Sequence, residues 1–379
     1  MNAATARAEG GMNLNGRTIW QHAAGDTDRD YVDVCIQNGV ILNGPGRAGP
    51  WPAQMDEVVG KNRRPKKLSD LRRFCEDMRA GDVVVLRLGT KLVPAVGVIV
   101  GDYEWNDAFG DVDGWDLEHV RRVRWAWVGE QPKEFDAYAI KWGDTTQRLN
   151  PGEVWDWVAS LKVDELKPLD LPELPSQKDA GEIGFDRISD FLFDRGVASA
   201  SIAYLMTEIG ELTRIARWYE RSSKDGSDGD QHPNRPSEHE TVAYLVVPLL
   251  RALGWTPQRM AVEWNKVDVA LFESLPRAGD NMSVVVEAKK LGRACLAARL
   301  QATGYADQRE GCLRLIVTDG LRYGVYVKQS DGNFGLHAYL NLTRLRDGYP
   351  AYRCGGAEDA MLAMSPDWRA INDSARDGG

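Results

Sequence analysis

The chain has 379 residues, of which 43% are hydrophobic and 27% charged, the balance of soluble globular proteins. These proportions exclude a largely disordered chain, and no apolar run reaches the roughly 18 residues of a membrane helix. The length suits two or three domains. The formal net charge of −9 argues against a protein that coats nucleic acid non-specifically, although a local basic patch can still bind phosphates.

The start of the chain, residues 1–17, is expected to be disordered. It lacks the apolar core of a secretory signal, so we expect a cytoplasmic protein without a membrane partner. Five scattered cysteines form no C-x-x-C pair, which argues against a disulfide framework and a structural zinc site. No G-x-x-x-x-G-K-[S/T] loop occurs, so no nucleotide cofactor is expected.

Residues 18–160 form the first expected domain, because β-type runs alternate there with turn signals. A helix is predicted over Leu68–Met78, ending near Gly81. Several short strands with one or two helices are typical of a small barrel-like β domain. The predicted strands are Thr18–His22, Tyr31–Ile36, Val83–Leu88, Leu92–Val100 and Arg121–Val128.

Residues 161–236 are expected to be a linker and helical segment. Lys167–Gln177 alternates proline with polar residues and leucine, which is typical of an extended linker. Amphipathic helices are predicted over Ile183–Gly196 and Ala198–Arg221. Ser222–Pro236 is poor in apolar residues and predicts a mobile loop.

Residues 237–365 form an expected α/β domain, followed by a polar tail at 366–379. Apolar residues from Val242 to Leu253 recur at three- and four-residue spacing and predict a helix that Pro248 kinks and Gly254 ends. The elements that follow have the order of an α/β sandwich. They are strands Arg259–Trp264, Val267–Phe272 and Ser283–Glu287, helix Arg293–Gln308, and strands Leu313–Thr318 and Tyr323–Lys328.

The strongest functional signal is Asp268 followed by Glu287-Ala288-Lys289. Both carboxylates fall in apolar strands, where a charge is costly unless a cation or a hydrogen-bond donor compensates it. On adjacent strands they converge, and paired carboxylates suit Mg²⁺. Strand alternation puts Glu287 and Lys289 on one face, where the lysine can orient a water and stabilise charge on a phosphate. The pattern indicates metal-assisted phosphodiester hydrolysis.

Either of two glutamates at the start of the long helix can complete this site. Extending the apolar stripe back by one turn from Val242 reaches Glu238, whereas Glu240 falls on the opposite face. We therefore expect Glu238 to face the metal. Glu240 stays the alternative, because Pro248 disturbs the phase of the helix.

A set of motif residues resembles the PD-(D/E)XK nuclease superfamily, most closely the nuclease domain that begins type I restriction motor subunits. The set comprises Glu238, Asp268, Glu287-Ala288-Lys289 and Gln301-Ala302-Thr303-Gly304-Tyr305. The resemblance runs from Glu238 to Tyr326 and implies a restriction endonuclease-like α/β fold. It also implies metal ligands at Asp268, Glu287 and Glu238, and catalytic roles for Lys289 and Gln301. Val267 departs from the proline that is usual there.

Structural alternatives accompany each of these roles. Asp268 and Lys289 can form an ordinary ion pair, with Glu287 a solvated charge at a strand end. Gln301 and Tyr305 lie four residues apart, hence on one helix face. They either reach Lys289 and the scissile phosphate or simply pack the helix.

Segments of the first domain resemble the EVE and YTH-like branch of PUA-type β-barrels. They are Ala80–Leu86, Pro94–Tyr103 and Arg121-Arg122-Val123-Arg124-Trp125. The resemblance implies an aromatic pocket for a base swung out of the duplex, often a modified one. The pocket candidates are Trp20, Trp51, Asp102, Tyr103 and Trp105. Core packing for the tryptophans and turn capping for Asp102 are the alternatives.

Two basic clusters flank these aromatic residues and are candidates for DNA backbone contacts, with a solvated surface as the alternative. The first comprises Lys61, Arg63, Arg64, Lys66 and Lys67 and continues with Arg72 and Arg73; the second comprises His119, Arg121, Arg122 and Arg124.

Together these features predict a modification-dependent, type IV-like restriction endonuclease. It is expected to bind double-stranded DNA with modified bases, to use Mg²⁺ (with Mn²⁺ as a substitute), and to act as a homodimer, because one such domain cuts one strand. The alternatives are a nuclease acting on RNA or on unmodified DNA structures, and a sensor whose nuclease fold is inactive.

Overall fold

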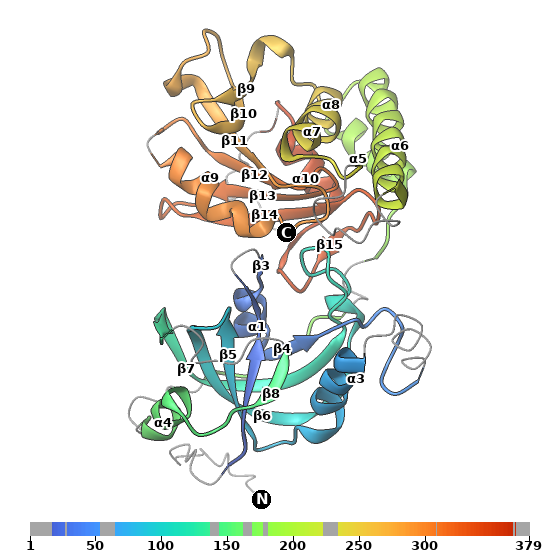
Figure 1. Cartoon of the computed structure of the whole chain (residues 1–379). Helices are drawn as coiled ribbons and strands as arrows, with labels where there is room; N and C mark the ends of the chain where they lie inside the picture. The colour runs from blue at the N-terminus through green and yellow to red at the C-terminus, as the bar shows by residue number, and fades with distance from the viewer. Residues whose placement is uncertain are drawn as a thin grey trace, which may run out of the picture. The chain divides into compact units, whose positions relative to one another are not determined.

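The computed structural model describes residues 17–26, 29–53, 65–136, 144–161, 169–176, 181–222, 234–307, 309–366 and 368. The chain divides into two compact units, Met1–Ser176 and Gln177–Gly379, each with its own β-sheet (Figure 1). No helix within the described ranges is long and apolar enough to cross a membrane. Residues 1–16, 223–233 and 369–379 lie outside the described residues. They make up most of the segments for which the sequence predicts a disordered start, a mobile loop and a polar tail.

The first unit is built on a curved six-stranded sheet with strand order β4-β7-β6-β5-β1-β8. β1 runs parallel to β5, and the other neighbours are antiparallel. Register shifts in the long β6–β7 ladder let the sheet curve into a half-barrel. The strands are β1 (Ile19–Ala23), β4 (Val40–Asn43), β5 (Val83–Leu88), β6 (Leu92–Trp105), β7 (His119–Glu134) and β8 (Thr146–Arg148), beside a small hairpin of β2 (Gly25–Asp26) and β3 (Arg29–Asp30).

The prediction of a strand over Tyr31–Ile36 is wrong, because this segment forms helix α1 (Val32–Asn38). The carboxylate of Asp30 accepts the Val32 N–H at 2.9 Å, and Gly39 ends the helix with a φ of 60°. Both are helix boundary signals that the alternating valines of this segment obscured.

Two further α-helices are described in the first unit. Helix α3 (Pro65–Arg72) continues as a π-helical turn over Arg73–Asp77, and α4 is Glu153–Ser160. Residues 169–176, part of the expected linker, belong to this unit. They run along β7, where the Leu169 N–H donates to the Trp125 carbonyl at 2.8 Å.

The second unit is built on an eight-stranded sheet with strand order β15-β16-β14-β13-β12-β11-β10-β9. The central pair β11–β12 is parallel, whereas β9, β10 and β11 are antiparallel to one another. The strands are β9 (Met260–Trp264), β10 (Val267–Phe272), β11 (Met282–Ala288), β12 (Arg314–Thr318), β13 (Arg322–Lys328), β14 (Phe334–Asn341), β15 (Gly348–Tyr349) and β16 (Cys354–Gly355). The last three strands were not among the predicted elements.

Helices cover both faces of this sheet (Figure 1). One face packs against α5 (Phe185–Asp194), α6 (Ser199–Ser222), α8 (Val247–Ala252) and α10 (Ala357–Met364). The other face packs against α9 (Arg299–Ala306) through a row of small alanines. The expected middle helices, α5 and α6, therefore belong to the core of the second unit. At this level the predicted organisation, a curved β-sheet unit followed by a layered α/β unit, is confirmed.

The long helix expected at the start of this domain is divided. Helix α7 (Glu238–Thr241) leads into a π-helical turn over Val242–Val246, and α8 follows. The irregular turn directly precedes Pro248, which lacks the N–H that an α-helix needs at that position.

Candidate functional site

Asp268 and Glu287 lie side by side on neighbouring strands of the second unit. Val269 pairs with Val286 in the antiparallel β10–β11 ladder, so the next step of the register places Asp268 opposite Glu287. The Asp268 carboxylate accepts the Ala288 N–H at 2.7 Å, which fixes it against the end of β11. Two like charges directly opposite each other destabilise a sheet, so this pairing needs compensation.

The raised pKa values of the two carboxylates show that the cost of burying their negative charges is only partly compensated. Burial raises the pKa of Glu287 to about 7, and the charges of Asp268 and Glu238 act in the same direction against Lys289. Burial also raises the pKa of Asp268, against the Ala288 N–H and Lys289. Glu287 is only 1% exposed, and its Oε2 atom has no hydrogen-bond partner. A buried acceptor without a partner costs about 1–3 kcal/mol unless a donor or a cation meets it.

Lys289 connects this pair to helix α9. Its Nζ atom donates to Glu287 Oε1 at 3.0 Å and to Gln301 Oε1 at 3.2 Å, and the Gln301 amide donates to the Tyr305 hydroxyl at 3.3 Å. Strand alternation accounts for the shared face of Glu287 and Lys289, and the four-residue spacing brings Gln301 and Tyr305 together on the helix. The expected contact of Gln301 with Lys289 is present.

The helix acid is distinguished by its hydrogen bonds. Ser237 and Glu240 form a capping box: the Glu240 carboxylate accepts the Ser237 N–H at 2.7 Å, and the Ser237 hydroxyl accepts the Glu240 N–H at 3.2 Å. Glu240 is therefore engaged in helix capping. Glu238 is therefore left as the candidate for the helix acid of the site. Its negative charge contributes to the raised pKa of Glu287.

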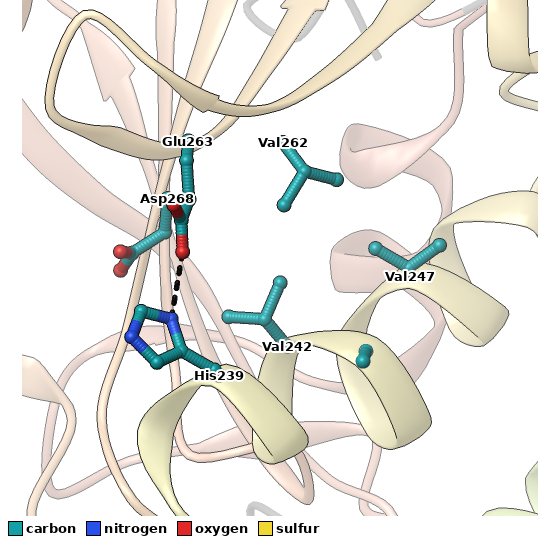
Figure 2. Close-up of a pocket in the computed structure, with 7 residues that line it drawn as sticks. His239, Val242, Val247, Val262, Glu263 and Asp268 are labelled. Atoms are coloured by element: carbon teal, nitrogen blue, oxygen red, sulfur yellow. Dashed lines mark ion pairs between the residues drawn. The ribbon is translucent and has the colours of Figure 1, made fainter.

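Two further residues at this site, His239 and Glu263, were not among the predicted ones. Val269 also pairs with Val262, so Glu263 is the cross-strand neighbour of Asp268 on β9. His239 Nδ1 lies 2.7 Å from Glu263 Oε1 (Figure 2). The two-residue Asn265-Lys266 hairpin turn, with positive φ at both positions, was the signal that sets this register.

Together with Asp268, these two residues border a pocket of about 300 Å³ between the helix and the β9–β10 hairpin (Figure 2). Its remaining lining is apolar and comprises Val242, Ala243, Val247 and Val262.

The oxygen donors of this site suit a divalent cation that keeps part of its water shell. Among the described residues, no group of three or more His, Cys, Asp or Glu side chains is already arranged as a metal cage. The bare Oε2 atom of Glu287 beside Asp268 nevertheless offers the hard oxygen ligands that Mg²⁺ prefers, and Mg²⁺ usually keeps several waters and takes one or two carboxylates. The residues therefore fit such an ion.

The expected base-pocket residues of the first unit have different surroundings. Trp20 is buried, and its indole N–H donates to Asp82 at 2.8 Å, so no ligand can stack on it without displacing the core. The Trp51 indole donates to Glu76 and its ring packs against α3. Asp102 is exposed.

Tyr103, Trp51 and Trp105 meet around the loop that follows β4. The Tyr103 hydroxyl accepts the Trp51 N–H at 2.9 Å and bonds His119 Nδ1 at 2.8 Å. The Trp105 indole donates to the Gly46 carbonyl at 2.9 Å, and its side chain is 36% exposed. Three of the five candidates thus lie at this loop, Trp51 bonding Tyr103 through its main-chain N–H and Trp105 bonding Gly46, whereas Trp20 lies in the core.

Some residues of the two basic clusters are exposed, and others are engaged in contacts within the fold. Lys61, Arg63 and Arg64 lie outside the described residues, whereas Lys66, Arg72 and Arg124 are exposed. The remaining basic residues of the two clusters are engaged within the fold: Lys67, Arg73, His119, Arg121 and Arg122.

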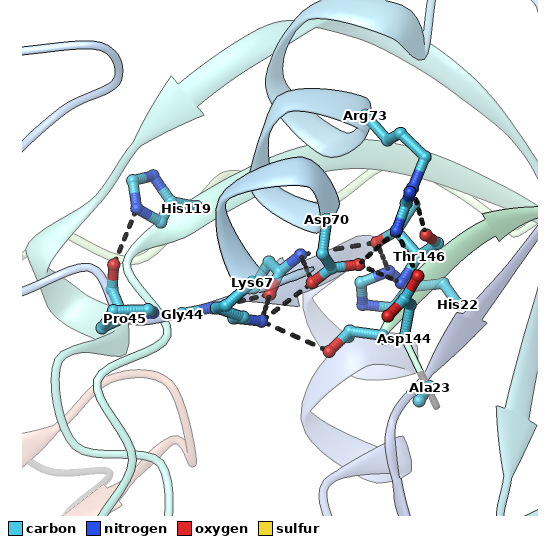
Figure 3. Close-up of polar contacts among 12 residues, drawn as sticks. His22, Ala23, Gly44, Pro45, Lys67, Asp70, Arg73, His119, Asp144 and Thr146 are labelled. Carbon is cyan, nitrogen blue, oxygen red and sulfur yellow. Dashed lines mark hydrogen bonds and ion pairs between the residues drawn. The ribbon is translucent and has the colours of Figure 1, made fainter. Parts of the chain in front are cut away.

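Two of these residues, Arg121 and Lys67, differ in how far they are buried. Arg121 is buried and donates to the carbonyls of Phe74 and Cys75 at 2.9 and 2.7 Å. Lys67 Nζ donates to Asn43 at 2.6 Å and to Asp70 at 2.9 Å (Figure 3). Because Arg121 is buried and its donors are taken up by main-chain carbonyls, the expectation that it contacts DNA is wrong. Lys67 is paired with Asp70, and its side chain is 28% exposed.

Comparison with known proteins gives one finding. A family described as a domain of unknown function (DUF8426) matches residues 20–147, which lie within the first unit. No curated protein and no solved structure matches the chain.

Proposed function

We propose that the second unit is a divalent-metal-dependent nuclease that hydrolyses phosphodiester bonds of DNA. The observation that supports this most is the buried carboxylate pair Asp268–Glu287, whose free Oε2 atom lies beside the lysine–glutamine contact of Lys289 and Gln301. Burial, together with the negative charges of Asp268 and Glu238, raises the pKa of Glu287, and a cation bound beside these carboxylates would stabilise their charged forms.

Asp268, Glu287 and Glu238 are the residues that would hold Mg²⁺, with Mn²⁺ as a substitute. A bound ion of this kind lowers the pKa of its water and neutralises charge on a phosphate oxygen. Lys289 supplies a fixed positive charge for the attacking water and for the developing phosphorane, and Gln301 orients the lysine. The Asp268–Ala288 hydrogen bond keeps one carboxylate fixed during the reaction.

The first unit is proposed as the module that reads a modified base, which makes the whole chain a modification-dependent restriction endonuclease. Support comes from the aromatic group Trp51, Tyr103 and Trp105 around one loop, with exposed Arg124 and Lys66 as candidates for phosphate contact. Since one catalytic unit cuts one strand, cleavage of a duplex calls for a homodimer or two bound copies.

The test is cleavage of matched duplexes containing cytosine, 5-methylcytosine, 5-hydroxymethylcytosine, its glucosylated form or modified adenine, with Mg²⁺ or Mn²⁺. We expect cleavage that excess EDTA stops and that Asp268→Ala, Glu287→Ala and Lys289→Ala each abolish while DNA binding persists. Lys328→Ala, at the far end of the same sheet, is the control and should retain activity. Full activity of Lys289→Ala, or cleavage in excess EDTA, would overturn the proposal of a metal-dependent nuclease. Cleavage of RNA and not of DNA would show that the substrate is RNA.

A further inference from the structure

The pocket beside Asp268 has two chemically different sides. Val242, Ala243 and Val247 from the helix face Val262 from β9, while His239, Glu263 and Asp268 form a polar edge (Figure 2). Its volume of about 300 Å³ lies at the small end of ligand pockets, which suits a single planar ring system rather than a larger cofactor.

The apolar side is only partly covered within the described fold: Val242 is buried, whereas Ala243 is exposed. Val262 is 55% exposed although it lies on a strand, and β9 is the last strand of its sheet. Exposed apolar surface that borders polar groups is typical of a binding site. A flat aromatic ring can cover these valines while its polar rim reaches His239 and Glu263.

The backbone at the polar edge is strained. Glu263 has a φ of 53°, in the left-handed region that glutamate rarely adopts. Such a conformation costs on the order of 1–3 kcal/mol and occurs preferentially at functional sites. Here it accompanies the 2.7 Å contact between Glu263 and His239, so the strained residue lies at the border of the pocket.

Asp268 belongs both to this pocket and to the carboxylate pair. A nucleotide whose phosphate lies at Asp268 and Glu287 therefore has a base within reach of the valine wall. We propose that the pocket holds an unstacked nucleobase next to the scissile phosphate; this rests on the proposed nuclease function and specifies how its site grips the substrate. His239 and Glu263 provide a donor and an acceptor for the edge of that base.

If a base occupies the pocket, one base beside the cut contributes more to substrate affinity than any other base. Stacking of one base on an aromatic side chain changes affinity by about 5- to 150-fold, and contact with an aliphatic valine wall is expected to give the lower end of that range. Replacing that one base by an abasic residue should therefore raise KM by this factor with little change in kcat, while abasic residues elsewhere near the cut have smaller effects.

The experiment scans a cleaved duplex, its cut position mapped, with a single abasic residue at each position in turn. It is run on the full chain and on Ala243→Phe, whose new ring fills the pocket from an exposed helix position. Ala203→Phe, also on an exposed helix face, is the control, and melting curves check folding. The expected result is a single sensitive position in the wild type and in Ala203→Phe that is lost in Ala243→Phe. Equal sensitivity at all positions, or an unchanged scan in Ala243→Phe, overturns the pocket.

A second measurement separates this proposal from the proposed function. Thymidine and adenosine 5′-monophosphates are titrated in Mg²⁺ and followed by saturation-transfer NMR on the wild type and on Ala243→Phe. If no substrate is cleaved but the mononucleotides bind and Ala243→Phe abolishes binding, the pocket stands and the nuclease function falls. If DNA is cleaved but the abasic scan is flat, the nuclease function stands and the pocket falls. If neither cleavage nor binding occurs, both fall.

Discussion

Two buried histidines in the first unit are held in their neutral form by the same arrangement. His22 Nδ1 accepts from the Thr146 hydroxyl at 2.9 Å (Figure 3). Its Nε2 donates to the Leu42 carbonyl, also at 2.9 Å. His119 Nε2 donates to the Pro45 carbonyl at 2.9 Å, with Tyr103 on its Nδ1. Burial lowers the pKa of each histidine to about 4, so a proton on either ring would break an accepted hydrogen bond inside the fold.

This arrangement predicts an acid-sensitive first unit. The folded pKa is about 4 and the unfolded value 6.5, so below pH 6.5 the unfolded chain binds protons that the folded chain does not. Stability is therefore full above pH 6.5 and is lost as the pH falls toward 4, by on the order of 3 kcal/mol per histidine. Denaturant melts at pH 7 and pH 4.5 measure this.

His22→Gln should reduce the pH dependence, whatever it costs in absolute stability. His239→Gln, which removes an exposed histidine of the second unit, is measured alongside as the comparison. An equal slope in His22→Gln and the wild type would contradict the assignment.

A second prediction at this scale separates a structural arginine from a surface one. Arg121→Ala leaves the carbonyls of Phe74 and Cys75 without their donor, which costs about 1–3 kcal/mol for each buried group, so the melting temperature should fall. Arg124→Ala should melt normally and weaken binding to all duplexes alike, with a flatter salt dependence. A normal melting curve for Arg121→Ala, or unchanged DNA affinity for Arg124→Ala, would show that the roles are assigned wrongly.

At the scale of single elements, the two glutamates at the start of α7 have different expected roles: Glu240 caps the helix and Glu238 faces the carboxylate pair. Glutamine can replace glutamate in a capping box, so Glu240→Gln should keep both stability and cleavage. Ser237→Ala should cost about 0.5–2 kcal/mol of stability without removing activity. Glu238→Gln should instead reduce cleavage and weaken Mg²⁺ binding at normal stability. Calorimetry of Mg²⁺ binding with the three variants tests this, and an inactive Glu240→Gln would exchange the roles.

The sequence predicted those elements whose pattern is set by their own residues. Val83–Leu88 and Val267–Phe272 form strands over the predicted residues, because short runs rich in valine and other apolar residues favour a strand. The Glu287-x-Lys289 face follows from strand alternation in the same way. The strand prediction failed for the segment that forms helix Val32–Asn38. Its valines alternate as in a strand, whereas Asp30 and Gly39 mark the ends of a helix.

Other features depend on contacts that no local pattern carries. Trp20 has the composition of a pocket residue, but its burial is decided by β5, β8 and the Asp82 carboxylate. Arg121 has the sequence signature of a surface cation, but the π-helical turn after α3 supplies two carbonyls that bind it in the interior. Glu263 became a site residue only through a hairpin register and a left-handed backbone, both of which depend on tertiary structure.

At the scale of the whole molecule, the two units have separate hydrophobic cores. The first closes around residues of β1, β5, β6, β7 and α4, and the second around both faces of its own sheet. Because each core is complete within its unit, each is expected to fold without the other. The boundary between Ser176 and Gln177 is therefore the place to divide the chain.

Division at this boundary yields the last prediction. A fragment ending at Ser176 should show a cooperative melt and should prefer modified over plain duplex, since the aromatic group around Tyr103 lies entirely within it. The fragment beginning at Gln177 should keep metal-dependent cleavage but lose the preference, because it retains Asp268, Glu287 and Lys289 and none of those aromatic residues. Both properties are measured on the same set of modified duplexes. If the second fragment still discriminates between them, selectivity resides in the catalytic unit and its pocket rather than in the first unit.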